Sequence, residues 1–359
     1  MIDLGFRAQF LLLHSQKDLD GDGSFDAVQT MKLRRGRLRV LGKVNEKVES
    51  FFQTEVGDFS GSGQDMRLID AWINYKSDPW AQFFFGLNMV PANRQNLTSS
   101  GGLMAIDRPG LAYKSLNWGG RSLTGFANNT FSPSSAGFNT NGRVRDLGIT
   151  LFGSGDVGDN AHLKYYAGVY DGIQRATTDN ELFSGRVQLN FGDAEGGYYN
   201  NSTYVGKKNT IGVGASFSSQ KAVTMDEADD SDVDYSYISF DGFLEKPMGS
   251  GSVTAEVGYA ILDFGDFGDL MMAQGAGFYG QLGYLVDGTW QPWFEYEAWT
   301  SDDTAEAGSY TSMRFGVTYF VQGHNANFKA GIEMFKPEVP FTAEEDQMMS
   351  AVFGAYVTY

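Results

Sequence analysis

Three arginines near the start of the chain, Arg35, Arg37 and Arg39, are spaced two residues apart. In an extended strand such residues point to the same face, so the three guanidinium groups would form a column. Arginine keeps its charge and can hold a phosphate or carboxylate group through two parallel hydrogen bonds. A column of this kind, continued by Lys43, offers a moving anion a series of weak binding sites. The spacing therefore predicts an anion path.

A second stretch whose residues could bind a ligand is DLDGDGSFD at 18–26. A flexible turn of this composition can bind Ca²⁺ weakly, because hard cations prefer oxygen ligands. The ligands would be Asp18, Asp20, Asp22, Asp26 and the main-chain carbonyl of Ser24. An EF-hand is excluded because position 12 of the motif is Gln29 and both flanks alternate with a period of two. The stretch is then either a weak structural calcium site or a solvated acidic turn, and we expect that no cofactor is required.

The residues that enzyme catalysis would need are scattered. The three histidines, His14, His162 and His324, occur in separate regions, and none lies beside a nucleophile motif. A hydrolase needs its histidine in a defined constellation with a nucleophile. The chain has no cysteine, so its fold must be closed without disulfides. We expect that the protein is not an enzyme.

The elements that position these residues are extended segments in which apolar and polar residues alternate. Sixteen such segments recur to the end of the chain, and most are 9 to 15 residues long. A tilted strand needs about this length to cross a hydrocarbon layer of about 30 Å. The segments are 2–14, 31–43, 47–57, 66–76, 81–89, 143–153, 162–171, 183–191, 208–219, 234–247, 252–264, 275–286, 289–300, 310–322, 327–336 and 348–359. The whole chain, 1–359, is expected to form a single all-β domain.

Two folds could use this alternation: a closed transmembrane antiparallel β-barrel of 16 strands and a soluble β-sandwich. The barrel points its apolar face at lipid, whereas the sandwich points it inward. Sandwich strands are usually only about 5 or 6 residues long, and 46 glycines with 28 phenylalanines and 18 tyrosines are typical of twisted, closed sheets. We therefore favour the barrel. Arginines on its lipid face would cost about 2–4 kcal/mol each near the midplane, so the arginine column is expected to line the lumen.

The connections between the segments alternate between short ones, such as 44–47 and 287–288, and longer acidic ones. Bacterial outer-membrane barrels have short periplasmic turns and long external loops, which predicts that both termini are periplasmic. Acidic external loops such as 226–232 could hold divalent ions that bridge lipopolysaccharide. One short-side connection, around 192–207, is longer than this rule expects. Met1 leads directly into the first segment, as expected of a mature chain with an added start Met.

The longest connection, 90–142, has no strong strand pattern. A loop of this length is normally functional or disordered. As the third external loop, folded into the lumen, it would narrow an otherwise wide channel and add Arg94, Arg108 and Arg121 to the anion path. If it lay outside instead, the wide lumen would suit a sleeve or channel component of a larger outer-membrane complex.

Several motifs, taken in order, resemble the phosphate-selective porin family (porins O and P). They are RRGRLR at 34–39, RLIDAWINY at 67–75, FGLNMVP at 85–91, LTSS at 97–100, IDRP at 106–109, RDLGITLFG at 145–153 and YAGVYDG at 166–172. The resemblance implies a trimeric porin of sixteen strands whose arginine ladder maps to Arg35, Arg37 and Arg39. Many relatives carry a lysine before the proline of the loop, whereas this sequence has Met89-Val90-Pro91, and 90–142 holds only Lys114 as a lysine. This departure weakens the implied selectivity for phosphate.

Two interpretations of the arginine column remain open. The arginines could meet acidic residues across the lumen, which would give a general, weakly selective pore, or they could stay unpaired and favour anions. The acidic residues on polar faces are Glu49, Glu55, Asp70, Glu295 and Glu297. The net charge of −17 argues against nucleic acid as a partner, because neutralising phosphates requires a basic surface. The expected partners are outer-membrane lipid, other copies in a homotrimer, and small anionic or neutral solutes.

Overall fold

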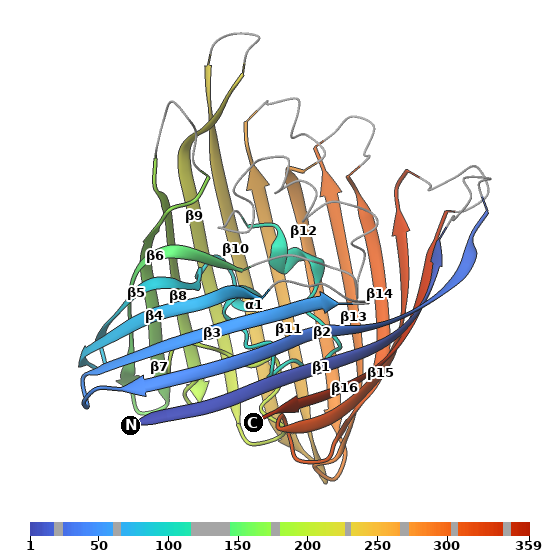
Figure 1. Ribbon diagram of the computed structural model, residues 1–359, viewed down its shortest axis with the longest axis horizontal. Coiled ribbons are helices and arrows are strands. Elements are labelled where there is room, and N and C mark those ends of the chain that lie inside the picture. The colour runs from blue at the N-terminus through green and yellow to red at the C-terminus, as the bar shows by residue number, and fades with distance from the viewer. Residues whose placement is uncertain are drawn as a thin grey trace.

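The computed structural model describes residues 1–17, 24–59, 66–115, 144–173, 180–226, 231–265, 273–302, 308–339 and 346–359, with the backbone alone at 57–59 and 226. Within these residues, sixteen strands form one closed antiparallel barrel in which each strand pairs with its neighbours in the chain and β1 closes against β16 (Figure 1). The strands are β1 (Ile2–Lys17), β2 (Asp26–Lys43), β3 (Val48–Phe59), β4 (Arg67–Asp78), β5 (Ala81–Met89), β6 (Arg145–Gly158), β7 (Ala161–Tyr170), β8 (Leu182–Gly192), β9 (Thr210–Asp226), β10 (Ser231–Met248), β11 (Gly251–Asp263), β12 (Gly275–Leu285), β13 (Trp290–Ser301), β14 (Tyr310–Phe320), β15 (Ala326–Pro337) and β16 (Met348–Thr358). The predicted sixteen-stranded barrel is confirmed.

The large apolar side chains of the barrel wall point outward. On β9, Phe217 is 54% exposed while the adjacent Ser218 is 1% exposed, and on β15 Phe328 is 42% exposed while Lys329 is 3% exposed. A soluble sandwich would bury the phenylalanines and expose the serine and the lysine. A transmembrane barrel places apolar residues against lipid and polar residues toward the lumen. The sandwich alternative is therefore wrong.

Several strands continue past their expected ends on the long-loop side. The strand β1 reaches Lys17, and β2 begins at Asp26, which pairs with Lys17. In the same way β9 and β10 extend to the pair of Asp226 with Ser231. These polar ends are held by backbone hydrogen bonds, which need no apolar face. Alternation detects only the apolar band, so it misses them.

A β-bulge in β2 changes which arginines face the lumen. Gln9 of β1 pairs with Arg35, whereas the next residue, Phe10, pairs with Leu33. Arg34 is the extra residue, and a bulge of this kind re-aims side chains near functional sites. As a result Arg34 and Arg35, which are neighbours in the sequence, are both buried inside the barrel, with 5% and 3% exposure.

Two connections fold into the barrel from opposite ends. We call residues 90–115 the loop-side insert and residues 193–209 the turn-side insert. The loop-side insert carries α1 (Arg94–Leu97) and η1 (Gly110–Tyr113) and lies inside the barrel (Figure 1). The inserts meet at Asn200. Its main-chain N–H donates to the carbonyl of Leu97 (3.0 Å), and its carbonyl accepts from the main-chain N–H of Ser99 (2.9 Å). Among the described residues, neither helix has the length or the apolar character to cross a membrane.

Candidate functional site

Arginine side chains are concentrated on the part of the lumen wall that β1 and β2 form. Arg7 and Arg37 are paired across these strands. Both donate from Nη1 to the same hydroxyl, that of Ser100 in the loop-side insert, at 2.7 Å each. Arg7 also donates from Nε to the Thr358 hydroxyl at 3.2 Å. Sequence reasoning missed Arg7, although it occupies a polar position between the outward residues Phe6 and Ala8.

Arg35 and its neighbour Arg34 in the bulge both form ion pairs with an acidic residue of the loop-side insert. Asp107 accepts from Nε of Arg34 at 2.9 Å and from Nη2 of Arg35 at 2.8 Å. The three side chains are buried. Burial alone would raise the pKa of Asp107, but the two guanidinium groups hold it well below its usual range. The ion pairs fasten the insert to the wall, so Arg35 has a positioning role in this structure.

Arg37, the next member of the predicted column, is also paired. Its Nε donates to Glu55, which accepts in addition from Arg67 at 2.8 Å. Asp70 accepts from Nε of Arg145 at 2.8 Å, and Arg145 is a second lumen cation that sequence reasoning did not identify. The predicted pairing with lumen acids thus holds for Arg37.

Arg39, by contrast, contacts no acidic side chain among the described residues. Its Nη2 donates to the main-chain oxygen of Tyr359 at 2.7 Å, and its Nε is buried with no hydrogen-bond partner in this part of the chain. Lys43 is exposed at the end of β2. Of the other predicted partners, Glu49 pairs with Lys76 at 2.7 Å, and Glu295 pairs with Arg314.

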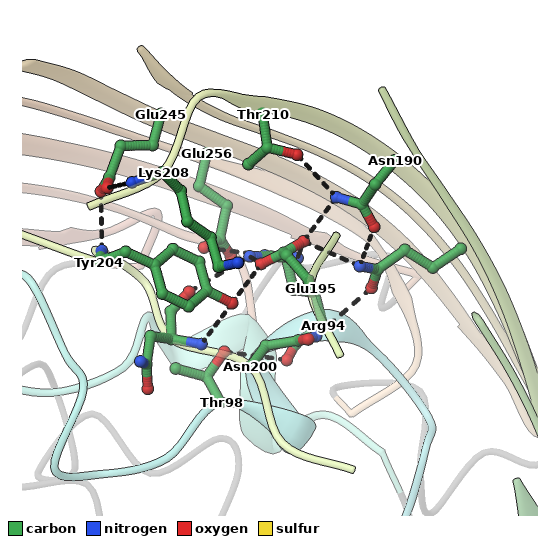
Figure 2. A network of polar contacts seen from close by, with 12 residues as sticks. Arg94, Thr98, Asn190, Glu195, Asn200, Tyr204, Lys208, Thr210, Glu245 and Glu256 are labelled. Carbon is green, nitrogen blue, oxygen red and sulfur yellow. Dashed lines mark hydrogen bonds and ion pairs between the residues drawn. The ribbon is translucent and has the colours of Figure 1, made fainter. Parts of the chain in front are cut away.

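Arg94 lies at the centre of a buried network that joins the two inserts (Figure 2). Its Nη1 and Nη2 donate to Oε2 and Oε1 of Glu195 at 2.9 and 2.6 Å. Glu256 of β11 lies 3.4 Å from Nε, and the guanidinium group covers the ring of Phe243 at 4.0 Å. Glu195 also accepts from the Tyr204 hydroxyl at 2.6 Å. Arg94 is therefore enclosed by protein rather than open to a solute.

The turn-side insert is fixed at further points along its length. Glu245 of β10 accepts from the main-chain N–H of Tyr204 at 2.7 Å. On another part of the wall, His324 lies between β14 and β15 with its Nε2 2.8 Å from the carbonyl oxygen of Thr203. The unusual length of this connection was visible in the sequence, but nothing in its composition predicted that it folds inward.

Two further predicted arginines of 90–142 have different outcomes. Arg108 donates from Nε to the carbonyl of Gln95 at 2.9 Å and from Nη2 to the carbonyl of Thr98, so it holds the backbone around α1. Arg121 lies outside the described residues. Lys114 is fully buried, with its Nζ 4.4 Å from the centre of the Trp299 ring.

The predicted calcium loop lies mostly outside the described residues. Asp18, Asp20 and Asp22 fall there, whereas Ser24 precedes β2 and Asp26 begins it. In the described part of the chain, no group of three histidine or acidic residues could hold a metal ion. The calcium site therefore stays a prediction.

The three histidines share no contact residue among their described hydrogen bonds. His162 lies 2.6 Å from Asp156 and 2.7 Å from the carbonyl oxygen of Gly192, His324 contacts Thr203, and His14 is exposed. None of these contacts is with a serine or threonine hydroxyl, which a nucleophile would supply. The absence of enzyme activity stays a prediction.

Comparison with known proteins finds relatives by structure alone. No family model and no curated protein matches the sequence. OmpT, an outer membrane protein of Vibrio cholerae, is similar over 100% of this chain and 99% of its own, with 15% identity and a TM-score of 0.59. The anion-selective porin from Comamonas acidovorans (11% identity, 100% and 99% covered, TM-score 0.58) and the outer membrane channel DcaP of Acinetobacter baumannii (13%, 100% and 97%, 0.58) are also similar.

At 11 to 15% identity, these similarities establish the fold and leave the predicted phosphate-selective family unconfirmed. The chain has the closed sixteen-stranded antiparallel barrel of outer-membrane porins.

Proposed function

We propose that this protein is a porin of the bacterial outer membrane that lets small hydrophilic solutes diffuse passively and prefers anions. The observation that carries the proposal is that Arg7 faces the lumen side of β1, donates to the hydroxyls of Thr358 and Ser100, and has no acidic side-chain partner among the described residues. A lumen wall with uncompensated positive charge raises the local concentration of anions. No enzymatic step is part of the proposal.

The proposed anion path follows Arg7, Arg37, Arg39 and Arg145, with Lys43 at the mouth. Arg7 is paired with Arg37 across β1 and β2, and Arg39 and Arg145 line the same cavity. The nearby acids Glu55 and Asp70 are each engaged by a guanidinium group. Arg121 stays in the proposed path as predicted.

Three arginines of the predicted path are better assigned to holding the inserts in place. Arg35 binds Asp107, Arg94 binds Glu195, and Arg108 binds main-chain carbonyls. Unlike Arg7, Arg37, Arg39 and Arg145, none of these three lines the cavity beside β1 and β2. Each is buried and hydrogen-bonded within the protein, so a passing solute would have to displace these contacts to reach it. We therefore leave Arg35, Arg94 and Arg108 out of the path.

We infer that the loop-side insert is the constriction of the pore. The support is that it is anchored to several parts of the wall: to Arg35 of β2, to Glu256 of β11 through Gln95 at 2.8 Å, and to Lys329 of β15 through the carbonyl of Ala105 at 2.7 Å. A sleeve for a larger complex needs a wide lumen, and a lumen occupied by two inserts does not favour that alternative.

The cellular setting is proposed on the same grounds. The outward apolar band suits a bilayer, and the short turns suit a periplasmic side that also carries both termini. We propose a homotrimer because the OmpT structure is described as a trimer form. Lipopolysaccharide and divalent ions at the acidic external loops complete the proposed partners.

The decisive experiment is the reversal potential of the purified protein in a planar bilayer with a gradient of potassium chloride. We expect the sign that reports chloride as the more permeant ion. A sign that reports potassium would overturn the anion preference. A value near zero would favour the general, weakly selective pore.

A further inference from the structure

A cavity of about 320 Å³ is lined by Arg7 and Arg39 and contains two chemically different groups of side chains. We call its arginines, Arg7, Arg37, Arg39 and Arg145, the charged side and its aromatic residues, Phe51, Trp72 and Tyr199, the aromatic side. We propose that this cavity binds small aromatic carboxylates and thereby selects them over inorganic anions. The inference rests on the proposed porin function, because the cavity borders the proposed anion path.

The charged side has two cations available for a ligand. The acids that line the cavity are already engaged: Glu49 pairs with Lys76 at 2.7 Å, and Asp70 pairs with Arg145 at 2.8 Å. Arg37 pairs with Glu55, which leaves Arg7 and Arg39 without an acidic side chain in the described residues.

Arg7 and Arg39 are brought to one face by the register of β1 and β2. Gly5 pairs with Arg39, and Arg7, two residues further along β1, pairs with Arg37. A side chain at position 5 would lie 3.1 Å from Nη2 of Arg39, so glycine leaves room for this guanidinium group. Two guanidinium groups on one face can receive the two oxygens of a carboxylate through charge-assisted hydrogen bonds.

The aromatic side is rigid. Trp72 stacks on Phe84 with ring centres 4.2 Å apart and on Phe51 with centres 5.2 Å apart. Phe84 in turn stacks on Tyr198 of the turn-side insert at 4.4 Å. Trp72 is 7% exposed, while Phe51 and Tyr199 are only partly buried. The cavity therefore meets the edge of a stacked aromatic cluster whose rings support one another.

A ligand that uses both sides must carry charge and a flat apolar surface. Hydrated phosphate or chloride would contact the guanidinium groups and leave the aromatic surface in water. An aromatic carboxylate pairs its charge with the arginines and removes its ring, together with the wall, from water, which is favourable. The cavity volume is at the lower end of the roughly 300–1,000 Å³ typical of small-molecule pockets, so a ligand with one ring is expected.

The test is isothermal titration calorimetry on the intact protein in detergent with four probes: benzoate, acetate, phosphate and benzyl alcohol. We expect benzoate to bind at least tenfold more tightly than acetate and phosphate, because only benzoate supplies a ring. We also expect it to bind at least tenfold more tightly than benzyl alcohol, which has the ring but no charge. Equal affinities for benzoate and acetate, or tighter binding of phosphate, would overturn the proposal.

Three variants assign the binding to this cavity. Arg7→Gln should weaken benzoate and acetate binding about tenfold, whereas Phe51→Leu should weaken benzoate several-fold and leave acetate unchanged. Lys246→Gln removes a cation from an exposed position of β10 outside the cavity and should change neither affinity. Circular dichroism checks that each variant keeps its barrel. A folded Phe51→Leu protein with an unaltered ratio of benzoate to acetate affinity would refute the aromatic contribution.

The binding experiment can fail independently of the porin proposal. If the reversal potential reports chloride preference but benzoate binds no better than acetate, the aromatic carboxylate site is wrong and the anion-preferring porin stands. If benzoate binds as expected but potassium is the more permeant ion, the site stands and the anion preference is wrong.

Discussion

Arg94 and Glu195 form a two-point ion pair between segments that enter the barrel from opposite ends. The donor–acceptor distances are 2.9 and 2.6 Å, and both side chains are almost completely buried. Neither residue belongs to the barrel wall, so the pair joins one insert to the other. We infer that this contact keeps the turn-side insert inside the lumen.

Replacing Glu195 with Gln should therefore loosen the turn-side insert. Breaking one partner of a buried pair leaves an uncompensated charge and typically costs about 3–5 kcal/mol. We expect a larger single-channel conductance and faster proteolysis within 194–207 while the barrel stays folded. The control is Lys221→Gln, which removes an exposed ion pair with Asp234 and should cost no more than about 1 kcal/mol. Unchanged conductance in the Glu195 variant would show that the insert is held by other contacts.

The same contact predicts a dependence on pH. Burial alone would raise the pKa of Glu195, but Arg94 lowers it to about 2, below the usual value of about 4.3. Because the folded pKa is depressed, the stabilisation is complete above about pH 4.3 and is lost as the pH falls toward 2. The charged and titratable groups that act on this carboxylate include Arg94, Lys164 and Tyr204, and Glu256 faces Arg94. Single-channel conductance should rise over this acidic range.

Two variants separate this transition from other titrations. The acidic rise in conductance should be absent in Glu195→Gln. His324, which contacts the same insert at Thr203, has a pKa lowered to about 4 by burial. Because a buried imidazolium loses its contact with water, protonation of His324 destabilises the folded state around it as the pH falls below about 6.5. His324→Gln should remove that earlier part of the response and leave the Glu195 part. An identical pH profile in all three proteins would contradict both assignments.

Arg7→Gln should reduce the preference for chloride over potassium at least twofold. The variant removes a buried lumen cation that has no acidic side-chain partner among the described residues, and its neighbours are other arginines. Reversal potentials in asymmetric potassium chloride measure the change. Lys246→Gln serves as the matched control, because this exposed lysine of β10 lies outside the cavity and its charge is screened by salt. Equal effects of the two variants would indicate that only the overall charge matters.

Arg35→Gln should act mainly on stability. Asp107 would keep Arg34 but lose a guanidinium group that contacts both of its oxygens, at 2.8 and 3.1 Å. Hydrogen bonds to charged groups contribute about 1.5–3 kcal/mol each, so a lower midpoint of thermal unfolding is expected. The measurement is circular dichroism in detergent, with Arg7→Gln as the comparison. A larger loss of ion selectivity than of stability would return Arg35 to the anion path.

Gly86→Ala should destabilise the barrel at β5. Gly86 has a φ of +123°, and an added Cβ would lie 2.2 Å from the main-chain oxygen of Ala71. The strained backbone and the clash should together cost about 2 kcal/mol or more. Gly196→Ala is the control, because its Cβ would meet nothing within 4 Å. Thermal unfolding distinguishes the two, and an equal effect would mean that the strand can shift to accept the side chain.

The order and type of the wall elements were determined by the sequence alone. Alternation with a period of two is a local property that steric rules turn into a strand with one apolar face. The recurrence of such strands at a length that crosses a membrane favours lipid on that face. Even the bounds of β5, 81–89, follow from it. The pattern cannot show which polar residues meet inside, because that depends on the partners that the register brings opposite one another.

Only the tertiary structure decided which arginines are paired. Arg35 and Arg37 look equivalent in the sequence, but Arg35 meets Asp107, which is carried by an insert far along the chain, and Arg37 meets Glu55 across one strand pair. The bulge at Arg34 and the inward path of 193–209 are likewise products of long-range contacts. Such contacts form between residues whose separation in the sequence carries no periodic signal, so the charge available to a solute is set by the fold.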